Sequence, residues 1–458
     1  PAPRGPLVRQ NLIILFSSYL FYGWLDWRML GLILLTSVST YLSALYIDRS
    51  DGSRGRQKII SVANILINIS VLGVFKYFNF FGENFSRLFN IFGFEMDWMT
   101  RDILLPIGIS FYTFTALSYS IDVYMRRIKA ERDVVSVFAY IAFFPHLLAG
   151  PIARATSLLP QFRRCREFDY AMAVDGMRLL LYGLFKKIVI ADNLNVFVNA
   201  IFENYQGESG STLLLGAFYF TIQIYCDFSG YSDMAIGVAK LLGINLLQNF
   251  RMPYFSRNVA EFWRRWHISL NTWFRDYIYI PLGGSHKGVL MTIVNTMIIF
   301  LVCGFWHGAN WTFILWGAYH GLLFVPLILT GGNKLYKDSI AQGRRFPNVM
   351  EIAGIVVTFV LIMFGWILFR ADNIYQAFGY MANIFDASLF SAPQYFSKIY
   401  MFIIFVMFLV EWLGRGHEFE FYISGVRSKW IRRVVYIVIL LLIFIYGKSS
   451  ENFIYFNF

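Results

Sequence analysis

Three histidines in the second half of the sequence could do chemistry. His267 stands in the charged and aromatic stretch FWRRWHISLNTW, His307 stands in GFWHGANW, and His320 follows thirteen residues later. No charged residue occurs from 291 to 306, so His307 ends an apolar run that we place at membrane depth. A titratable side chain there is costly and by default indicates a functional site. We expect the rest of the chain to bring His267 and His307 to one cavity that substrates can reach.

Several kinds of chemistry use such histidines, and the residues alone leave them open. His307 and His320 are thirteen residues apart and no HExxH motif occurs, so we predict no metal site. Two histidines on facing helices could hold a haem, although nothing else in the sequence indicates one. A transporter could use histidines as a proton relay, and broken helices favour that reading. An acyltransferase could use a neutral imidazole as the general base for an attacking hydroxyl. A purely structural role is the last alternative.

The residues around His267 suggest how it is positioned. Residues 261–276 have the pattern of an amphipathic helix that is too charged to span a membrane, so we expect it to lie in the interface. Asn271 is four residues after His267 and should share its face of that helix. Three arginines of this region could bind phosphates of a substrate or, equally, of lipids: Arg264, Arg265 and Arg275.

The composition is that of a membrane protein. The 458 residues are 57% hydrophobic and only 15% charged, which predicts an all-α polytopic membrane protein. The net charge is +12, but the basic residues fall in short loops between apolar runs. That pattern is typical of cytoplasmic loops and of contact with membrane lipids, so we predict no nucleic-acid partner. The three cysteines are scattered and predict no disulfide framework.

The apolar stretches predict about eleven membrane-spanning helices, with re-entrant or interfacial helices between them. Prolines and glycines should break residues 143–162. His146 lies in this segment and could have a catalytic role, but we expect it to cap the broken helix. Asp227 and Asp233, six residues apart, could form a metal site or an acid/base pair, but we expect them to cap two half-helices within residues 213–247. Lys186 and Lys187 interrupt another apolar run and should extend toward an interface.

Motifs spread over residues 105–329 resemble a known family. They are LPIGISFYTF (105–114), FFPHLLAGPI (143–152), the segment from Phe228 to Gly230, FWRRWHISLNTWFRDYIYIPLGG (262–284), GFWHGANW (304–311) and WGAYHG (316–321). Together they resemble the membrane-bound O-acyltransferase (MBOAT) superfamily. Within it, the chain looks like the bacterial branch that O-acetylates alginate and peptidoglycan, and more distantly like the D-alanyl transfer protein of teichoic-acid modification.

The resemblance implies a fold and a site. It implies one membrane-embedded acyltransferase domain over 1–458, with a core at 105–329, peripheral helices at 11–81 and 350–447, and a central funnel. His307 would be the essential catalytic residue and His267 its partner. His267, held by Asn271, would position the thioester or stabilise its oxyanion. Trp306 and His320 would support the site.

The resemblance also implies an activity and a location. The chain would receive an acetyl group from a cytoplasmic thioester donor, acetyl-CoA, with no bound cofactor. It would hand the group to an extracytoplasmic SGNH or esterase-like acetyltransferase partner that modifies a polysaccharide such as alginate or peptidoglycan. This places the protein in the bacterial cytoplasmic (inner) membrane. D-alanyl transfer from a carrier protein and a histidine proton relay in a transporter remain the alternatives.

Overall fold

The computed structural model describes residues 4–94 and 105–447, and their regular structure is entirely helical. Five of the helices are long and apolar enough to cross a membrane: Trp27–Arg49, Arg54–Ile91, Val289–His307, Trp311–Leu329 and Val349–Arg370. The predicted all-α membrane class is therefore confirmed. The expected total of about eleven spans stays a prediction, because length and hydropathy select only these five within the described ranges.

The chain forms two compact units, one made of Pro1–Gly176 with Ala235–Leu247 and the other of Met177–Met234 with Gln248–Phe458. The expected single domain over 1–458 stays a prediction. Helices α9 (Tyr170–Leu184) and α11 (Gly210–Leu241) contribute residues to both units. The other helices of the first unit are α1 (Arg4–Leu25), α2 (Leu30–Arg49), α3 (Arg54–Leu72), α4 (Phe78–Ile91), α5 (Ile109–Tyr124), α6 (Val134–Ala142), α7 (Phe144–Leu147) and α8 (Ala155–Phe162).

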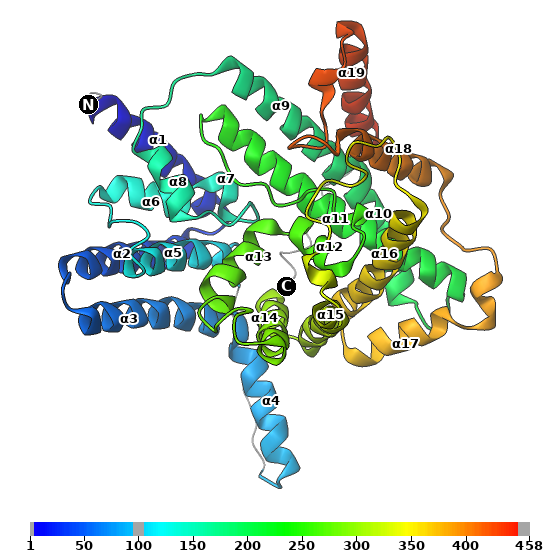
Figure 1. The fold of residues 1–458 in the computed structure, drawn as a ribbon, viewed down its shortest axis with the longest axis horizontal. Coiled ribbons are helices and arrows are strands. Elements are labelled where there is room, and N and C mark those ends of the chain that lie inside the picture. Colours follow the sequence, from blue (N-terminus) through cyan, green and yellow to red (C-terminus); the bar gives the residue numbers. More distant parts are fainter. Residues whose placement is uncertain (1–3, 95–104, 448–458) are drawn as a thin grey trace. The chain divides into compact units, whose positions relative to one another are not determined.

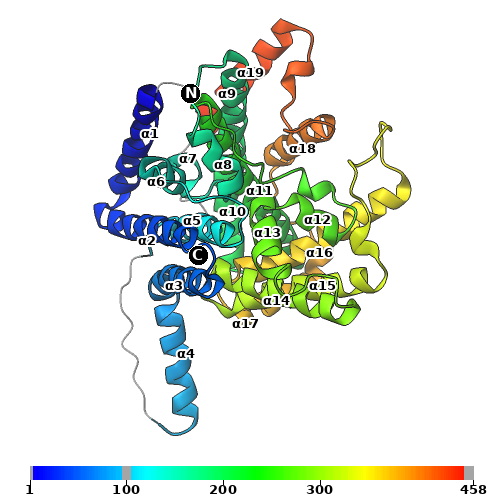
Figure 2. The same cartoon turned by 60° about the vertical axis from the view of Figure 1, so that its left-hand side comes forward.

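Helix α5 forms the polar interior of the first unit. It packs against α2 and α3, which lie beside it in Figures 1 and 2. Two of its hydroxyl groups have partners on other segments: Ser120 accepts a hydrogen bond from Asn64 at 2.8 Å, and Ser118 lies 3.2 Å from the Tyr140 hydroxyl. Hydroxyl-rich helices are expected to face protein rather than lipid, and this one does.

The predicted break after residue 142 is confirmed. Helix α6 ends at Ala142, α7 covers one turn, and an extended stretch leads to α8. His146 is fully buried, and its Nε2 lies 3.2 Å from the carbonyl oxygen of Tyr140 near the end of α6. That contact fits the structural role expected for His146 at a broken helix.

The second unit holds the remaining helices, and α11 is the longest among the described residues. The others are α10 (Asp192–Glu203), α12 (Val259–Arg265), α13 (Ile268–Phe274), α14 (Val289–His307), α15 (Trp311–Leu329), α16 (Val349–Arg370), α17 (Ile374–Ile384), α18 (Lys398–Gly414) and α19 (Lys429–Tyr446). A π-helical stretch, Phe185–Ala191, joins α9 to α10.

The prediction that Asp227 and Asp233 cap two half-helices is wrong, because α11 runs without a break through both. Asp233 forms an ion pair with Lys186 at 2.6 Å, and Asp227 forms one with Lys187 at 2.8 Å. The prediction for Lys186 is wrong as well, whereas the one for Lys187, whose side chain is 13% exposed, stays a prediction. Each carboxylate is neutralised across the helix packing, so neither needs a helix end, and Lys186 is fully buried rather than extended to an interface.

Helices α14 and α15 form a close antiparallel hairpin, which Figures 1 and 2 both show side by side. A Cβ at Gly304 would lie 2.2 Å from the carbonyl oxygen of Phe313, and one at Gly317 would lie 2.2 Å from that of Phe300. The two backbones can approach this closely only because both positions are glycine. Helix α14 ends at His307, so this close packing holds the helix that carries His307.

Candidate functional site

His267 lies at a sharp turn between α12 and α13. The predicted continuous helix over 261–276 is wrong, because Trp266 is extended and His267 has left-handed backbone angles, φ 45° and ψ 54°. Asn258 begins α12 by accepting a hydrogen bond from the backbone of Glu261 at 2.8 Å. A left-handed residue other than glycine costs roughly 1–3 kcal/mol, and such residues are enriched at functional sites.

The imidazole of His267 is enclosed by groups from other segments. Its Nδ1 lies 3.3 Å from Oδ1 of Asn249, and the ring of Phe228 in α11 meets it edge-on at 4.7 Å between centroids. The side chain is buried, and burial lowers the pKa of His267 to about 3. The ring is therefore neutral at physiological pH, which is the form that can accept a proton or a hydrogen bond.

Asn271 supports the turn, but it does not share a face with His267 as the sequence predicted. Its Nδ2 donates to the carbonyl oxygens of Trp263 and Trp266, both at 2.6 Å, and so caps the end of α12. The turn at His267 breaks the helical register on which that prediction depended. Asn249 makes the contact that was expected of Asn271, and no local spacing in the sequence could have indicated it, because it lies eighteen residues before His267.

His307 is the last residue of α14 and is 5% exposed. Its ring lies among three aromatic rings: Trp306 at 4.8 Å, Trp316 of α15 at 5.2 Å and Phe369 of α16 at 5.2 Å between centroids. After it the chain extends through Gly308, and Asn310 starts α15 by accepting from the backbone of Thr312 at 3.1 Å. This short connection keeps His307, at the end of α14, close to the start of α15.

The structure brings all three predicted histidines into one aromatic cluster. The ring of Trp306 contacts that of His267 at 6.3 Å as well as that of His307, so one indole links the two. Trp316 links His307 to His320, whose ring lies 5.0 Å away. His320 accepts a hydrogen bond at Nδ1 from the indole of Trp263 in α12 at 3.4 Å. We call this set of three histidines with Trp263, Trp306 and Trp316 the histidine–tryptophan cluster.

The three arginines near His267 all have partners within the chain. Arg265 is buried and pairs with Glu261 at 2.9 Å, so it braces α12. Arg264 donates to the carbonyl oxygens of Asn333 and Leu335 at 2.9 and 2.6 Å. Arg275 pairs with the neighbouring Asp276 at 2.7 Å and is well exposed.

A cavity of about 230 Å³ opens beside two of these arginines. Arg264, Arg275 and Asn271 contribute polar groups to its wall, and Trp263 and Phe300, which also pack on His320, contribute apolar ones. Arg265 does not line it.

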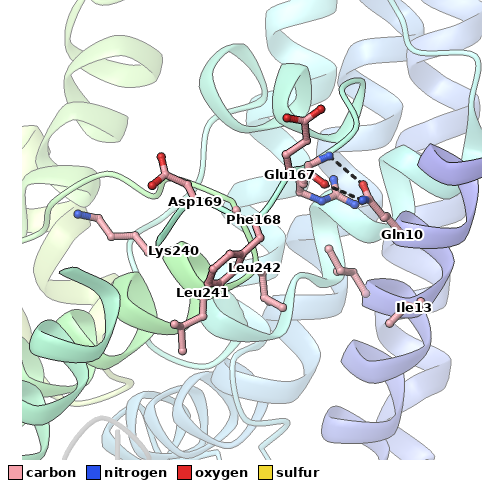
Figure 3. Close-up of a pocket in the computed structure, with 11 residues that line it drawn as sticks. Gln10, Ile13, Glu167, Phe168, Asp169, Lys240, Leu241 and Leu242 are labelled. Carbon is pink, nitrogen blue, oxygen red and sulfur yellow. Dashed lines mark hydrogen bonds between the residues drawn. The ribbon is translucent and has the colours of Figure 1, made fainter. Parts of the chain in front are cut away.

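Another cavity, of about 260 Å³, lies in the first unit and is drawn in Figure 3. Gln10 is held in its wall by hydrogen bonds with the backbone of Arg166 at 2.8 and 2.9 Å. None of the predicted site residues lines this cavity. Within residues 4–94 and 105–447, no three His, Cys, Asp or Glu side chains are grouped as metal ligands would be.

Comparison with known proteins decides the family. The model of the membrane-bound O-acyltransferase family matches residues 19–369, which include His267, His307 and His320. The chain belongs to the membrane-bound O-acyltransferase family. It is therefore a membrane-embedded acyltransferase, and its helical, apolar architecture is that of a membrane protein.

Relatives with named activities resemble the chain over much of its length. A probable alginate O-acetylase of Azotobacter vinelandii is 40% identical over 83% of this chain and 74% of the relative. The peptidoglycan O-acetyltransferase of Helicobacter pylori is 29% identical over 99% of this chain and 92% of the relative. The teichoic acid D-alanyltransferase of Bacillus subtilis is 26% identical over 59% of this chain and 69% of the relative.

Proposed function

We propose that this acyltransferase takes an acetyl group from a cytoplasmic thioester, acetyl-CoA, and passes it through the membrane for O-acetylation of an extracytoplasmic polysaccharide such as alginate or peptidoglycan. The identity of 40% with a probable alginate O-acetylase supports the acetyl group. The match to a peptidoglycan O-acetyltransferase over nearly the whole chain supports a cell-surface glycan as the final acceptor. In this scheme the protein resides in the bacterial inner membrane.

The observation that carries the proposal is the burial of His267 and His307 against the same indole, Trp306. His307 acts as the general base. It takes the proton of the accepting hydroxyl while that oxygen bonds to the thioester carbonyl carbon, the carbon–sulfur bond breaks, and the departing thiolate takes up the proton. Aromatic walls exclude water, which would otherwise hydrolyse the thioester.

The cavity beside Arg264 and Arg275 is the proposed entrance for the donor. Phosphates of the thioester would lie against the exposed guanidinium of Arg275, and the acyl arm would extend along Trp263 toward the histidine–tryptophan cluster. The acetyl group then leaves to an extracytoplasmic esterase-like partner, because a polysaccharide cannot enter a site buried among helices.

The test compares His307→Ala with a matched control, His286→Ala, which changes an exposed histidine in the connector before α14. Both variants are purified with the wild type, and release of free thiol from acetyl-CoA is followed in proteoliposomes supplied with the partner protein. We expect His307→Ala to lose turnover by a factor of about 10³ or more while remaining folded, since a positioned base contributes about 10²–10⁴-fold.

Three outcomes would contradict the proposal. Retained turnover in His307→Ala would remove the assigned base. Wild-type protein that ignores acetyl-CoA but transfers D-alanine from a charged carrier protein would point to the activity named for the Bacillus subtilis relative. Substrate flux into vesicles without thioester cleavage would indicate a transporter instead.

A further inference from the structure

The side-chain amide of Asn249 is fixed in one orientation by its neighbours. Its Nδ2 donates to the hydroxyl of Ser232 in α11 at 2.8 Å. Its Oδ1 accepts from the hydroxyl of Ser269 at 2.6 Å and from the backbone N–H of Ser269 at 3.4 Å. A backbone N–H can only donate, so the amide atom that faces it must be the oxygen. All three side chains are buried, which keeps water from competing for these bonds.

The same oxygen faces His267. The distance from Oδ1 of Asn249 to Nδ1 of His267 is 3.3 Å. An amide oxygen only accepts, so Nδ1 must carry the hydrogen of this bond. The ring is neutral, since burial lowers the pKa of His267 to about 3. A neutral imidazole has a single N–H, and therefore Nε2 presents a lone pair.

That lone pair is available. His267 is 1% exposed, and its Nε2 has no hydrogen-bond partner among the described residues. The rings of Phe228 and Trp306 pack against the imidazole at 4.7 and 6.3 Å between centroids, which hinders the ring rotation that would exchange its two nitrogens. A buried acceptor without a partner is costly, and a group bound at this atom would remove that cost.

We infer that Asn249 is a positioning residue that holds His267 with its proton on Nδ1, so that Nε2 accepts a hydrogen bond from an O–H or N–H group of a substrate. The inference rests on the proposed function, because it assigns the second histidine of that site a role. In this tautomer Nε2 of His267 cannot donate to the oxyanion of the tetrahedral intermediate, so the oxyanion role expected from the family resemblance is replaced by an acceptor role. The bound group belongs either to the accepting hydroxyl or to an amide N–H of the thioester donor.

The proton position can be measured without any activity. Wild-type protein labelled with ¹⁵N-histidine gives imidazole nitrogen shifts that distinguish Nδ1–H from Nε2–H, and His267→Gln identifies the signal that belongs to His267. We expect the Nδ1–H form at pH 7. A proton on Nε2, or an equal mixture of the two forms, overturns the inference.

Two substitutions at Asn249 test the positioning role. Asn249→Leu removes the acceptor, and we expect kcat to fall on the order of 100-fold, since a triad histidine in the wrong tautomer loses even more. Asn249→Asp keeps an oxygen opposite Nδ1, and the Ser232 hydroxyl can turn to donate to it, so we expect the loss to stay within about tenfold. Equal losses in the two variants would mean that Asn249 only packs, which overturns the inference.

Asn68→Leu is the matched control, because Asn68 is also buried and its amide donates within its own helix, to Asn64. The Michaelis constants then identify the bound group. A raised KM for the thioester in Asn249→Leu assigns the hydrogen-bond donor to the thioester, and an unchanged KM with a lower kcat assigns it to the accepting hydroxyl. Wild-type protein that turned over no acetyl thioester would end the proposed function, yet the proton on His267 could still be located.

Discussion

Aromatic rings, several of them indoles, surround the histidines of this site. Trp306 touches the rings of His267 and His307, and Trp316 touches those of His307 and His320. A tryptophan ring is flat and rigid, has only two side-chain torsions and is closely packed, so it can hold the side chains that contact it at a fixed distance from each other. The spacing between His267 and His307, the proposed catalytic histidines, therefore depends on residues to which the proposal gives no chemical role.

Trp306 offers the sharpest test at this scale. Trp306→Leu keeps an apolar side chain but removes the indole that contacts both His267 and His307. We expect turnover to fall roughly 100-fold, because a displacement of a catalytic group by about 1 Å can cost that much. Trp306→Phe keeps a ring and should lose less. The rate of thioester cleavage is measured for both, and Trp24→Leu is the control, since Trp24 is 84% exposed. A wild-type rate in Trp306→Leu would show that the indole does not set the spacing.

At the scale of elements, the site depends on how closely helices approach. The hairpin of α14 and α15 places His307 at the end of one helix and the ring of Trp316 in the facing one. Apolar burial gives little drive for such association inside lipid, so backbone-to-backbone packing through small residues has to supply it. Gly304 and Gly317 do so here.

We expect Gly304→Ala to lower thermal stability. The added methyl would lie 2.2 Å from the carbonyl oxygen of Phe313, so the hairpin must open, and overpacking of this kind costs about 1–3 kcal/mol. Size-exclusion profiles of detergent-solubilised protein after heating measure the shift. Gly31→Ala in α2 is the control, because a Cβ there meets nothing within 4 Å. If both variants melted alike, close approach at Gly304 would not be what holds the hairpin.

The elements also show where sequence reasoning works and where it fails. The spans at α14, α15 and α16 could be predicted, since each carries its signal in its own apolar run. The unbroken course of α11 could not, because Asp233 looks like a helix cap until its partner Lys186 is known, and that partner is 47 positions away. The turn at His267 could not be predicted either. The stretch from 261 has helical periodicity, but packing against Asn249 and Phe228 imposes a left-handed residue.

In the proposed function the donor site faces the cytoplasm, and the orientation of the protein in the membrane can therefore be tested. Three connections of the first unit gather on one side of it. Arg126 pairs with Asp51 at 2.7 Å, Arg54 donates to the carbonyl of Tyr124 at 2.8 Å, and Arg163 pairs with Glu131. These connections are rich in basic residues: Arg49, Arg54, Arg56, Lys58, Arg126, Arg127, Lys129, Arg132, Arg163, Arg164 and Arg166. Short basic loops stay on the cytoplasmic side, so this face of the first unit should lie there.

Cysteine accessibility checks this orientation. Single cysteines at two positions, Ser50→Cys and Lys129→Cys, are introduced into a Cys165→Ser background, since Cys165 is partly accessible and lies in the third connection, whereas Cys226 and Cys303 are buried. A membrane-impermeant maleimide should label both in inverted vesicles and neither in intact cells, and permeabilised cells show that each thiol can react. Labelling of both from outside would mean that the basic face lies on the extracytoplasmic side, which is the reverse of the expected orientation. Labelling of the two from opposite sides would contradict the ion pair between Arg126 and Asp51, because residues that touch cannot lie across a bilayer from each other.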